Sequence, residues 1–222
     1  DPLWSRGLGD VYKRQELLST QKLQLVDALS PLHAGLIISA MALSAIPTSI
    51  LGGATLHRVG FLPLISGGFL LMAAGMALVV VSRGETLPLL VSALVLTGLG
   101  AGLAMSVSST AIINAAPLHR TGMASGVEAV SYEFGTLISI ALTGTLVPLL
   151  MARELPPHLA ELGTDALHHP ASHAAAASAY NAGYLSTIGG LACFALLLAA
   201  ITAWCFRDNP KSGDPYAATQ QK

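Results

Sequence analysis

The run LPLLVSALVLTGLGAGLAMSVSSTAII, residues 87–113, contains no charged side chain and no histidine. As an α-helix it would extend about 40 Å at about 1.5 Å per residue, whereas the hydrocarbon core of a bilayer is about 30 Å thick. We therefore expect residues 87–113 to cross a membrane as a tilted or protruding helix.

Four more apolar runs lie on either side of this one, and each is long enough to span a bilayer, which takes about 20 residues. The five helices are expected at residues 32–56, 61–82, 87–113, 123–151 and 179–206. This pattern predicts an all-α, polytopic membrane protein with five transmembrane helices in a membrane domain over 32–206. Around the helices we expect an external lead-in at 16–31, an external loop at 152–178 and a cytoplasmic tail at 207–222.

The overall composition agrees with a membrane protein and excludes a nucleic-acid partner. Of the 222 residues, 53% are hydrophobic and 10% are charged, and the mean hydropathy is +0.63. A typical soluble domain is about 25% charged. The net charge of −1 and the lack of a Lys/Arg cluster argue against binding to nucleic acid.

The orientation follows from the enrichment of Lys and Arg in short cytoplasmic loops. One side of the predicted domain carries five such residues, and the other carries three: Arg58, Arg120, Arg207, Lys211 and Lys222 against Lys22, Arg83 and Arg153. We assign the first side to the cytoplasm and the protein to a cell membrane.

The first fifteen residues, DPLWSRGLGDVYKRQ, do not fit this pattern. They have neither the apolar core nor the cleavage-site pattern of a signal peptide, and we expect no helix there. They resemble translated sequencing-adapter sequence, so we interpret 1–15 as a non-native artefact. The natural chain is then expected to begin upstream, which makes the 222 residues a C-terminal fragment.

Glu128 and Glu133 are the only carboxylates inside the apolar runs. An ionised side chain at the centre of a bilayer costs about 2.5–3.5 kcal/mol on insertion scales, so such residues usually face a protein interior or a wet cavity. Five residues of separation place the two about 140° apart around the helix. Measured from Met123, Glu133 lies about 15 Å deep and Glu128 about 8 Å deep, so Glu133 is the better candidate for proton coupling. Tyr132 supplies either an aromatic wall or simple packing.

Small residues mark faces where helices approach closely, because packing rather than hydrophobicity drives helix association in lipid. Five glycines are expected to serve this purpose: Gly98, Gly102, Gly122, Gly126 and Gly135. The turn 114–122 contains Pro117 and Arg120, which we interpret as structural or gating residues.

No pattern of catalytic residues is visible, so we expect neither an enzyme nor a cofactor. The sequence contains no nucleophile elbow and no HExxH motif. His169 and His173 are four residues apart but have no acidic or thiol ligand at a matching spacing, so we expect no metal site.

Three segments resemble the major facilitator superfamily, in particular its fourteen-helix drug:proton antiporter branch. The segment LQLVDALSPLHAGL (23–36) resembles the external entry to the tenth helix of that family, and GGATLHRVG (52–60) resembles its cytoplasmic loop motif. The segment 98–135, with its Ala-Ala-Pro-x-x-Arg turn and Glu-x-x-x-Tyr-Glu-x-Gly helix, is similar to efflux proteins for quaternary ammonium and biguanide antiseptics.

The resemblance implies that the five spans are helices ten to fourteen, part of a C-terminal bundle in a bacterial inner membrane. It implies proton-coupled efflux of lipophilic compounds, with cations favoured, by alternating access. The partners would be the bilayer, protons, the substrate and the missing N-terminal helices. Arg58 and Gly60 would act in the gating loop, where His57 replaces the usual Asp.

Two alternatives stay open. The chain could belong to a transporter of another solute, such as a metabolite or siderophore. It could also be a membrane scaffold subunit, in which Glu128 and Glu133 only hold helices together by hydrogen bonds.

Overall fold

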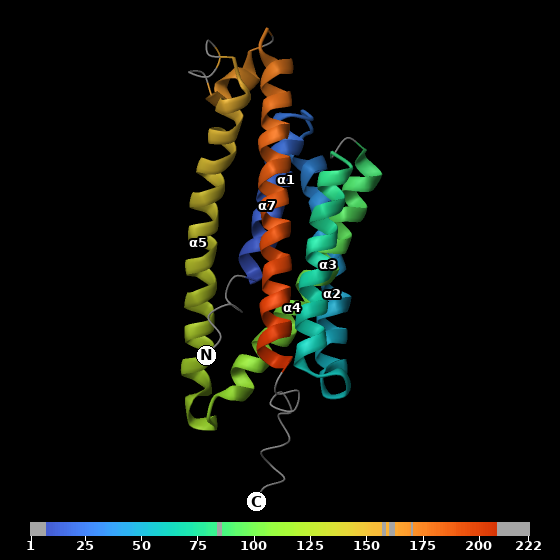
Figure 1. The fold of residues 1–222 in the computed structure, drawn as a ribbon, viewed down its shortest axis with the longest axis vertical. Helices are drawn as coiled ribbons and strands as arrows, with labels where there is room; N and C mark the ends of the chain where they lie inside the picture. The colour runs from blue at the N-terminus through green and yellow to red at the C-terminus, as the bar shows by residue number, and fades with distance from the viewer. Residues whose placement is uncertain (1–7, 84–85, 157–158, 160–162, 170, 208–222) are drawn as a thin grey trace, which may run out of the picture.

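The computed structural model describes residues 8–83, 86–156, 159, 163–169 and 171–207. The helices run side by side along one long axis (Figure 1). Five of those described are long and apolar enough to cross a membrane, which confirms the predicted all-α membrane fold. In chain order the elements are α1 (Leu8–Leu25), α2 (Pro31–Val59), α3 (Phe61–Val81), α4 (Leu87–Ala115), the 3-10 turn η2 (Leu118–Arg120), α5 (Thr121–Glu154), the 3-10 turn η3 (Gly163–His168) and α7 (His173–Arg207).

The spanning helices begin and end within a few residues of the predicted positions, with one larger difference. Helix α2 starts after Ser30, whose side chain accepts a hydrogen bond from the backbone N–H of His33, and it stops at Gly60, whose φ of 84° breaks the helix. Helix α7 begins at His173, so residues 173–178 belong to the helix rather than to the expected loop. Four alanines at 174–177 explain the extension, because alanine has the highest helix propensity.

Helix α1 is the element that the sequence did not predict. Residues 8–25 form one continuous helix, which includes residues 8–15, where no helix was expected. It contacts α2, α4, α5 and α7, and Leu18 and Leu23 on it are fully buried. Its charged residues keep it below the hydropathy of a membrane span, and tertiary contacts decide its position instead.

Helix α4 lies at the centre of the packing, with α2 on one side and α3 on the other. A Cβ at Gly98 would overlap the carbonyl oxygen of Met41, and one at Gly102 would overlap that of Ala45, both on α2. A Cβ at Gly68 of α3 would lie 2.9 Å from the carbonyl oxygen of Gly100. Glycine is therefore required where α4 meets both neighbours.

Two hydrogen bonds join α2 and α4 at the same crossing. The Ser44 hydroxyl donates to the Val95 carbonyl over 3.0 Å, and the Ser106 hydroxyl donates to the Ser49 carbonyl over 2.8 Å. Such interhelical bonds contribute about 0.6 kcal/mol on average in a membrane, so close packing is the larger contribution.

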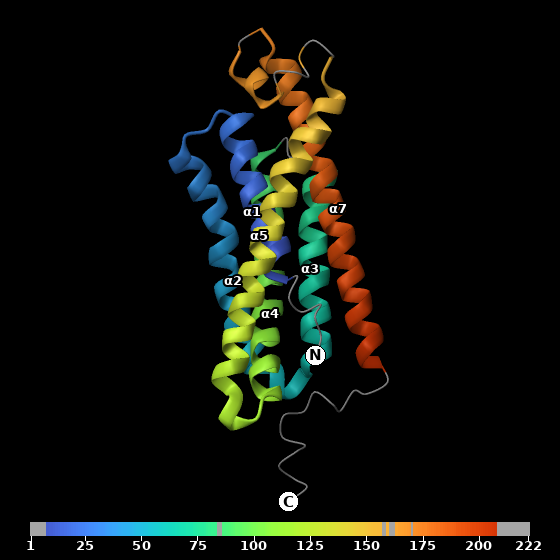
Figure 2. The ribbon, with the colours of Figure 1, turned by 90° about the vertical axis from the view of Figure 1, so that its left-hand side faces the viewer.

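The remaining helices extend the bundle outward from α3 and α4. Helix α7 packs against α3 and also against α5 (Figure 1). Turned by 90°, the molecule shows the α1–α2 turn, the α3–α4 turn and the 155–172 segment at one end, and the α2–α3 and α4–α5 turns at the other (Figure 2). We name the first end the 155–172 end, and it corresponds to the predicted external side.

Replacing Gly98 by Ala is expected to lower the free energy of unfolding by about 1–3 kcal/mol, because the new methyl group meets backbone that cannot move aside. The matched control is Gly126→Ala on α5, where a Cβ meets nothing within 4 Å. There, alanine should leave stability unchanged or raise it, because it favours helix. Thermal denaturation of both purified variants measures the difference, and equal denaturation temperatures would contradict this packing.

Candidate functional site

Glu128 and Glu133 lie on different faces of α5. Glu128 is half-buried, on a stripe with Tyr132 and Thr136 that faces the rest of the bundle. Glu133 is exposed and lies among exposed apolar side chains, which include Val130, Phe134 and Leu137. The residue ranked first by depth therefore points away from this bundle, and the shallower one points toward it.

Neither carboxylate has a hydrogen bond or ion pair to another residue in the part of the chain that the structure describes. The hydroxyl of Thr136 donates to the backbone carbonyl of Tyr132 over 3.0 Å, within the helix. An uncompensated carboxylate at bilayer depth is costly, so each Glu needs compensation from outside these residues.

The predicted gating residues lie at the end opposite to 155–172. Arg58 is exposed in the last turn of α2, one residue before the terminating turn at Gly60. Pro117 precedes η2 and accepts a backbone hydrogen bond of 2.8 Å from Arg120, which is exposed. These residues shape two short turns between helices.

The five predicted packing glycines divide into two groups. Gly98 and Gly102 meet the backbone of α2, as described above. A Cβ added at Gly122 or Gly126 of α5 would meet no other atom within 4 Å, and Gly135 is half-buried. The glycines at the start of α5 are thus free to meet another partner.

An apolar groove of about 770 Å³ lies away from both Glu residues. It is lined by Leu78 of α3 and by seven residues of α4 between Leu87 and Leu99, none of them charged. Among the described residues, no group of three or more His, Cys, Asp or Glu could hold a metal ion.

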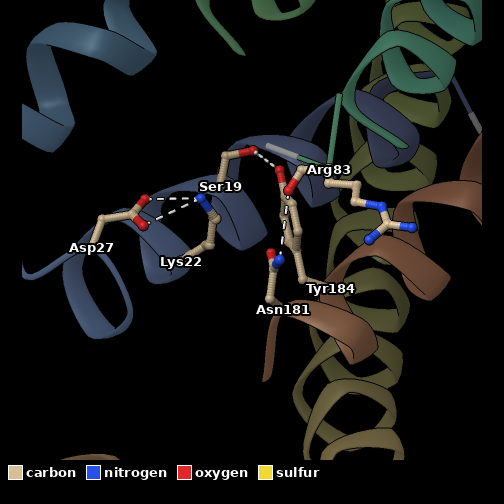
Figure 3. A network of polar contacts seen from close by, with 6 residues as sticks. All are labelled: Ser19, Lys22, Asp27, Arg83, Asn181 and Tyr184. Atoms are coloured by element: carbon tan, nitrogen blue, oxygen red, sulfur yellow. Dashed lines mark hydrogen bonds and ion pairs between the residues drawn. The ribbon is translucent and has the colours of Figure 1, made fainter. Parts of the chain in front are cut away.

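The sequence analysis missed a polar cluster at the 155–172 end (Figure 3). The hydroxyls of Ser19 on α1 and Tyr184 on α7 lie 3.0 Å apart, and both residues are fully buried. Lys22 is 4% exposed, and its ammonium lies 2.9 Å from the Asp27 carboxylate. Ser19, Lys22 and Asp27 fall outside the apolar runs, so a search of those runs for charges could not find the cluster.

Two more hydrogen bonds connect α7 to its neighbours in this cluster. The Tyr180 hydroxyl donates to the side-chain carbonyl of Gln21 over 3.4 Å. The Asn181 amide donates to the backbone carbonyl of Arg83, in the α3–α4 turn, over 3.5 Å. Residues 180–184 of α7 therefore bind both α1 and the α3–α4 turn.

Comparison with known proteins gives a family match over most of the chain. The sequence profile of the Major Facilitator Superfamily matches residues 14–221. The inward-open xylose transporter XylE from E. coli has a similar fold, with a TM-score of 0.57 and 18% identity over 99% of this chain and 54% of that chain.

Several curated bacterial transporters are similar in sequence. Multidrug resistance protein Stp of Mycobacterium tuberculosis is 30% identical over 143 residues, 64% of this chain and 27% of Stp. Methyl viologen resistance protein SmvA of Salmonella typhimurium is 31% identical over 135 residues, 60% of this chain and 27% of SmvA. Multidrug transporter protein MdtP of Bacillus subtilis is 27% identical over 149 residues, 65% of this chain and 28% of MdtP. The chain thus spans about a quarter of each relative's length.

Replacing Tyr184 by Phe is expected to destabilise the protein by about 1–3 kcal/mol, because the Ser19 hydroxyl then stays buried without its partner. The double variant Ser19→Ala/Tyr184→Phe should cost less than the sum of the two single changes, because it leaves no unsatisfied group. Ser186→Ala, at an exposed position of α7, is the control. A double-mutant cycle of unfolding free energies measures the coupling, and additive effects would show that the two hydroxyls do not interact.

Proposed function

The chain belongs to the Major Facilitator Superfamily, and we propose that it forms the C-terminal part of a longer, proton-coupled exporter of lipophilic compounds, with cations favoured. The names of Stp, SmvA and MdtP, which describe drug or methyl viologen resistance and transport, support export as the direction. Such transporters work by alternating access, in which one helix bundle moves against another around a site near the midplane.

The observation that carries the proposal is the Glu133 carboxylate on an uncovered, apolar face of α5. A permanent lipid contact for this face would leave an ionisable group in hydrocarbon at a cost of about 2.5–3.5 kcal/mol. The cost disappears if a second bundle covers the face and leaves a wet cavity beside the carboxylate. Glu133 can then exchange a proton against a cationic substrate.

The uneven burial of the helices supports a second bundle. In the most apolar windows of α2 and α5, 17% and 19% of residues are buried, against 50% in α3 and in α4. Helices α2 and α5 therefore contribute little of their surface to the core described here. We assign this surface to contact with the missing N-terminal helices of the same polypeptide, in a bacterial inner membrane.

Glu128 takes a supporting place in this proposal. Its half-buried position beside Tyr132 puts it on the bundle side of α5, where it can help to bind the substrate or the proton. The hydroxyl and ring of Tyr132 would then form part of the cavity wall.

In the full-length protein, Glu133→Gln is expected to abolish pH-driven exchange while the protein still reaches the membrane, because an amide cannot carry the proton. Glu128→Gln is expected to weaken exchange without abolishing it. Glu154→Gln, at the exposed end of α5, is the matched control and should behave as the wild type. Proton-coupled uptake of a lipophilic cation into inverted membrane vesicles measures exchange. Full exchange by Glu133→Gln would leave the scaffold alternative or another coupling residue.

The 222-residue chain alone is expected to transport nothing, because the cavity needs helices from outside it. Liposomes with the purified chain should show the same substrate flux as empty liposomes. Flux above that background, inhibited by Glu133→Gln, would refute the two-bundle proposal.

A further inference from the structure

Lys22 is the one charged side chain in the core, among the residues whose burial the structure describes. Its ammonium lies 2.9 Å and 3.3 Å from the two carboxylate oxygens of Asp27, five residues later in the chain. The side chain of Lys22 is 5% exposed and that of Asp27 is 35% exposed. One partner of the ion pair is thus buried, and the other can be reached from the surface at the 155–172 end.

Burying an ammonium is costly unless a counter-charge compensates for it, so Lys22 depends on the Asp27 carboxylate. Asp27 depends less on Lys22, because a third of its side chain meets the exterior. An external cation could therefore replace the ammonium at the carboxylate.

The surroundings of Asp27 suit an organic cation. Tyr184 lies within electrostatic range of Asp27 and of Tyr180, and aromatic rings attract organic cations by about 0.5–2 kcal/mol. Asp27 also follows the C-terminal end of α1, where its N–H bonds to the Lys22 carbonyl over 3.2 Å. The free carbonyls at a helix C-terminus favour positive charge.

We propose that Asp27 is a second binding carboxylate for a lipophilic organic cation, at the predicted external end, and that the Lys22 ammonium occupies it between transport events. When the cation binds to Asp27, Lys22 releases one proton to water and becomes a neutral amine, which a lysine in an apolar environment does readily. When a proton from outside returns to Lys22, the ion pair reforms and the cation leaves. This inference rests on the proposed export function, and it adds a release site distinct from Glu133.

Few other charged groups surround the pair. Helix α7 contributes Tyr180 and Tyr184, and α4 contains no Asp, Glu, Lys, Arg or His. Arg83, in the α3–α4 turn, lies on the other side of Tyr184 (Figure 3). Helix α2 contributes His33, which is exposed at its start, and α5 contributes Arg153 and Glu154, which are exposed at its end.

Binding of tetraphenylphosphonium to the full-length protein tests the proposal through two variants with opposite predictions. Asp27→Asn should raise the Kd at least about tenfold, because the carboxylate is lost. Lys22→Met should lower the Kd about tenfold, because the competing ammonium is gone, and it should release about one proton fewer per bound cation than the wild type. Arg83→Met, at the same end, is the matched control and should change neither quantity.

Lys22→Arg separates the charge from the packing. Arginine keeps the ion pair but cannot lose its proton, so the Kd should rise above that of the wild type and the extra proton should disappear. A pair that only fixes the α1–α2 turn predicts instead that Lys22→Arg resembles the wild type and that Asp27→Asn and Lys22→Met shift the Kd in the same direction. Either result would overturn the site.

Export by the wild type, measured in the same preparation, distinguishes this inference from the proposed function. Export with the same Kd in all variants overturns the Asp27 site alone. The predicted opposite shifts in Kd, together with no export by the wild type, would support the site and overturn the proposed function.

Discussion

Close contact between the backbone of α4 and its two neighbours is the constraint on which the rest of this bundle depends. Lipid chains are as apolar as leucine, so helices in a bilayer gain little from hydrophobicity and must gain from packing. Gly98 and Gly102 let α2 approach, and Gly100 opposite Gly68 lets α3 approach. With three helices fixed in this way, α7 packs on α3, and α5 follows on α7.

This order of attachment explains why α5 carries the candidate coupling residues on a poorly covered helix. Its buried residues, such as Val147 and Met151, lie near the 155–172 end, whereas the stretch around Glu133 is exposed or half-buried. A helix held at one end and largely uncovered elsewhere is suited to face a second bundle that moves. The same arrangement leaves the site incomplete within these 222 residues.

The sequence predicted the five spanning helices because hydropathy and length alone decide them. It did not predict α1, because Lys22 and its neighbours lower the local hydropathy and only tertiary contacts bury the helix. It predicted the angle between Glu128 and Glu133, but the direction in which each points depends on neighbouring helices. The glycine stripe of α4 and that at the start of α5 look alike in sequence, yet only Gly98 and Gly102 of these meet a helix. Small residues permit a close approach and do not specify the partner.

The two ionisable places in the bundle differ in how their charge is compensated. Lys22 has its counter-charge on the same chain, five residues away, so the pair can fold as part of this bundle. Glu133 has no such partner in the described residues, so its compensation must come from another bundle, from water, or from an exchanged proton or cation. An internally compensated pair opens only when a competing ion takes one partner, whereas an uncompensated carboxyl binds whatever cation reaches it. A transporter that moves protons against cations needs both kinds of group, one to capture the substrate and one to release it.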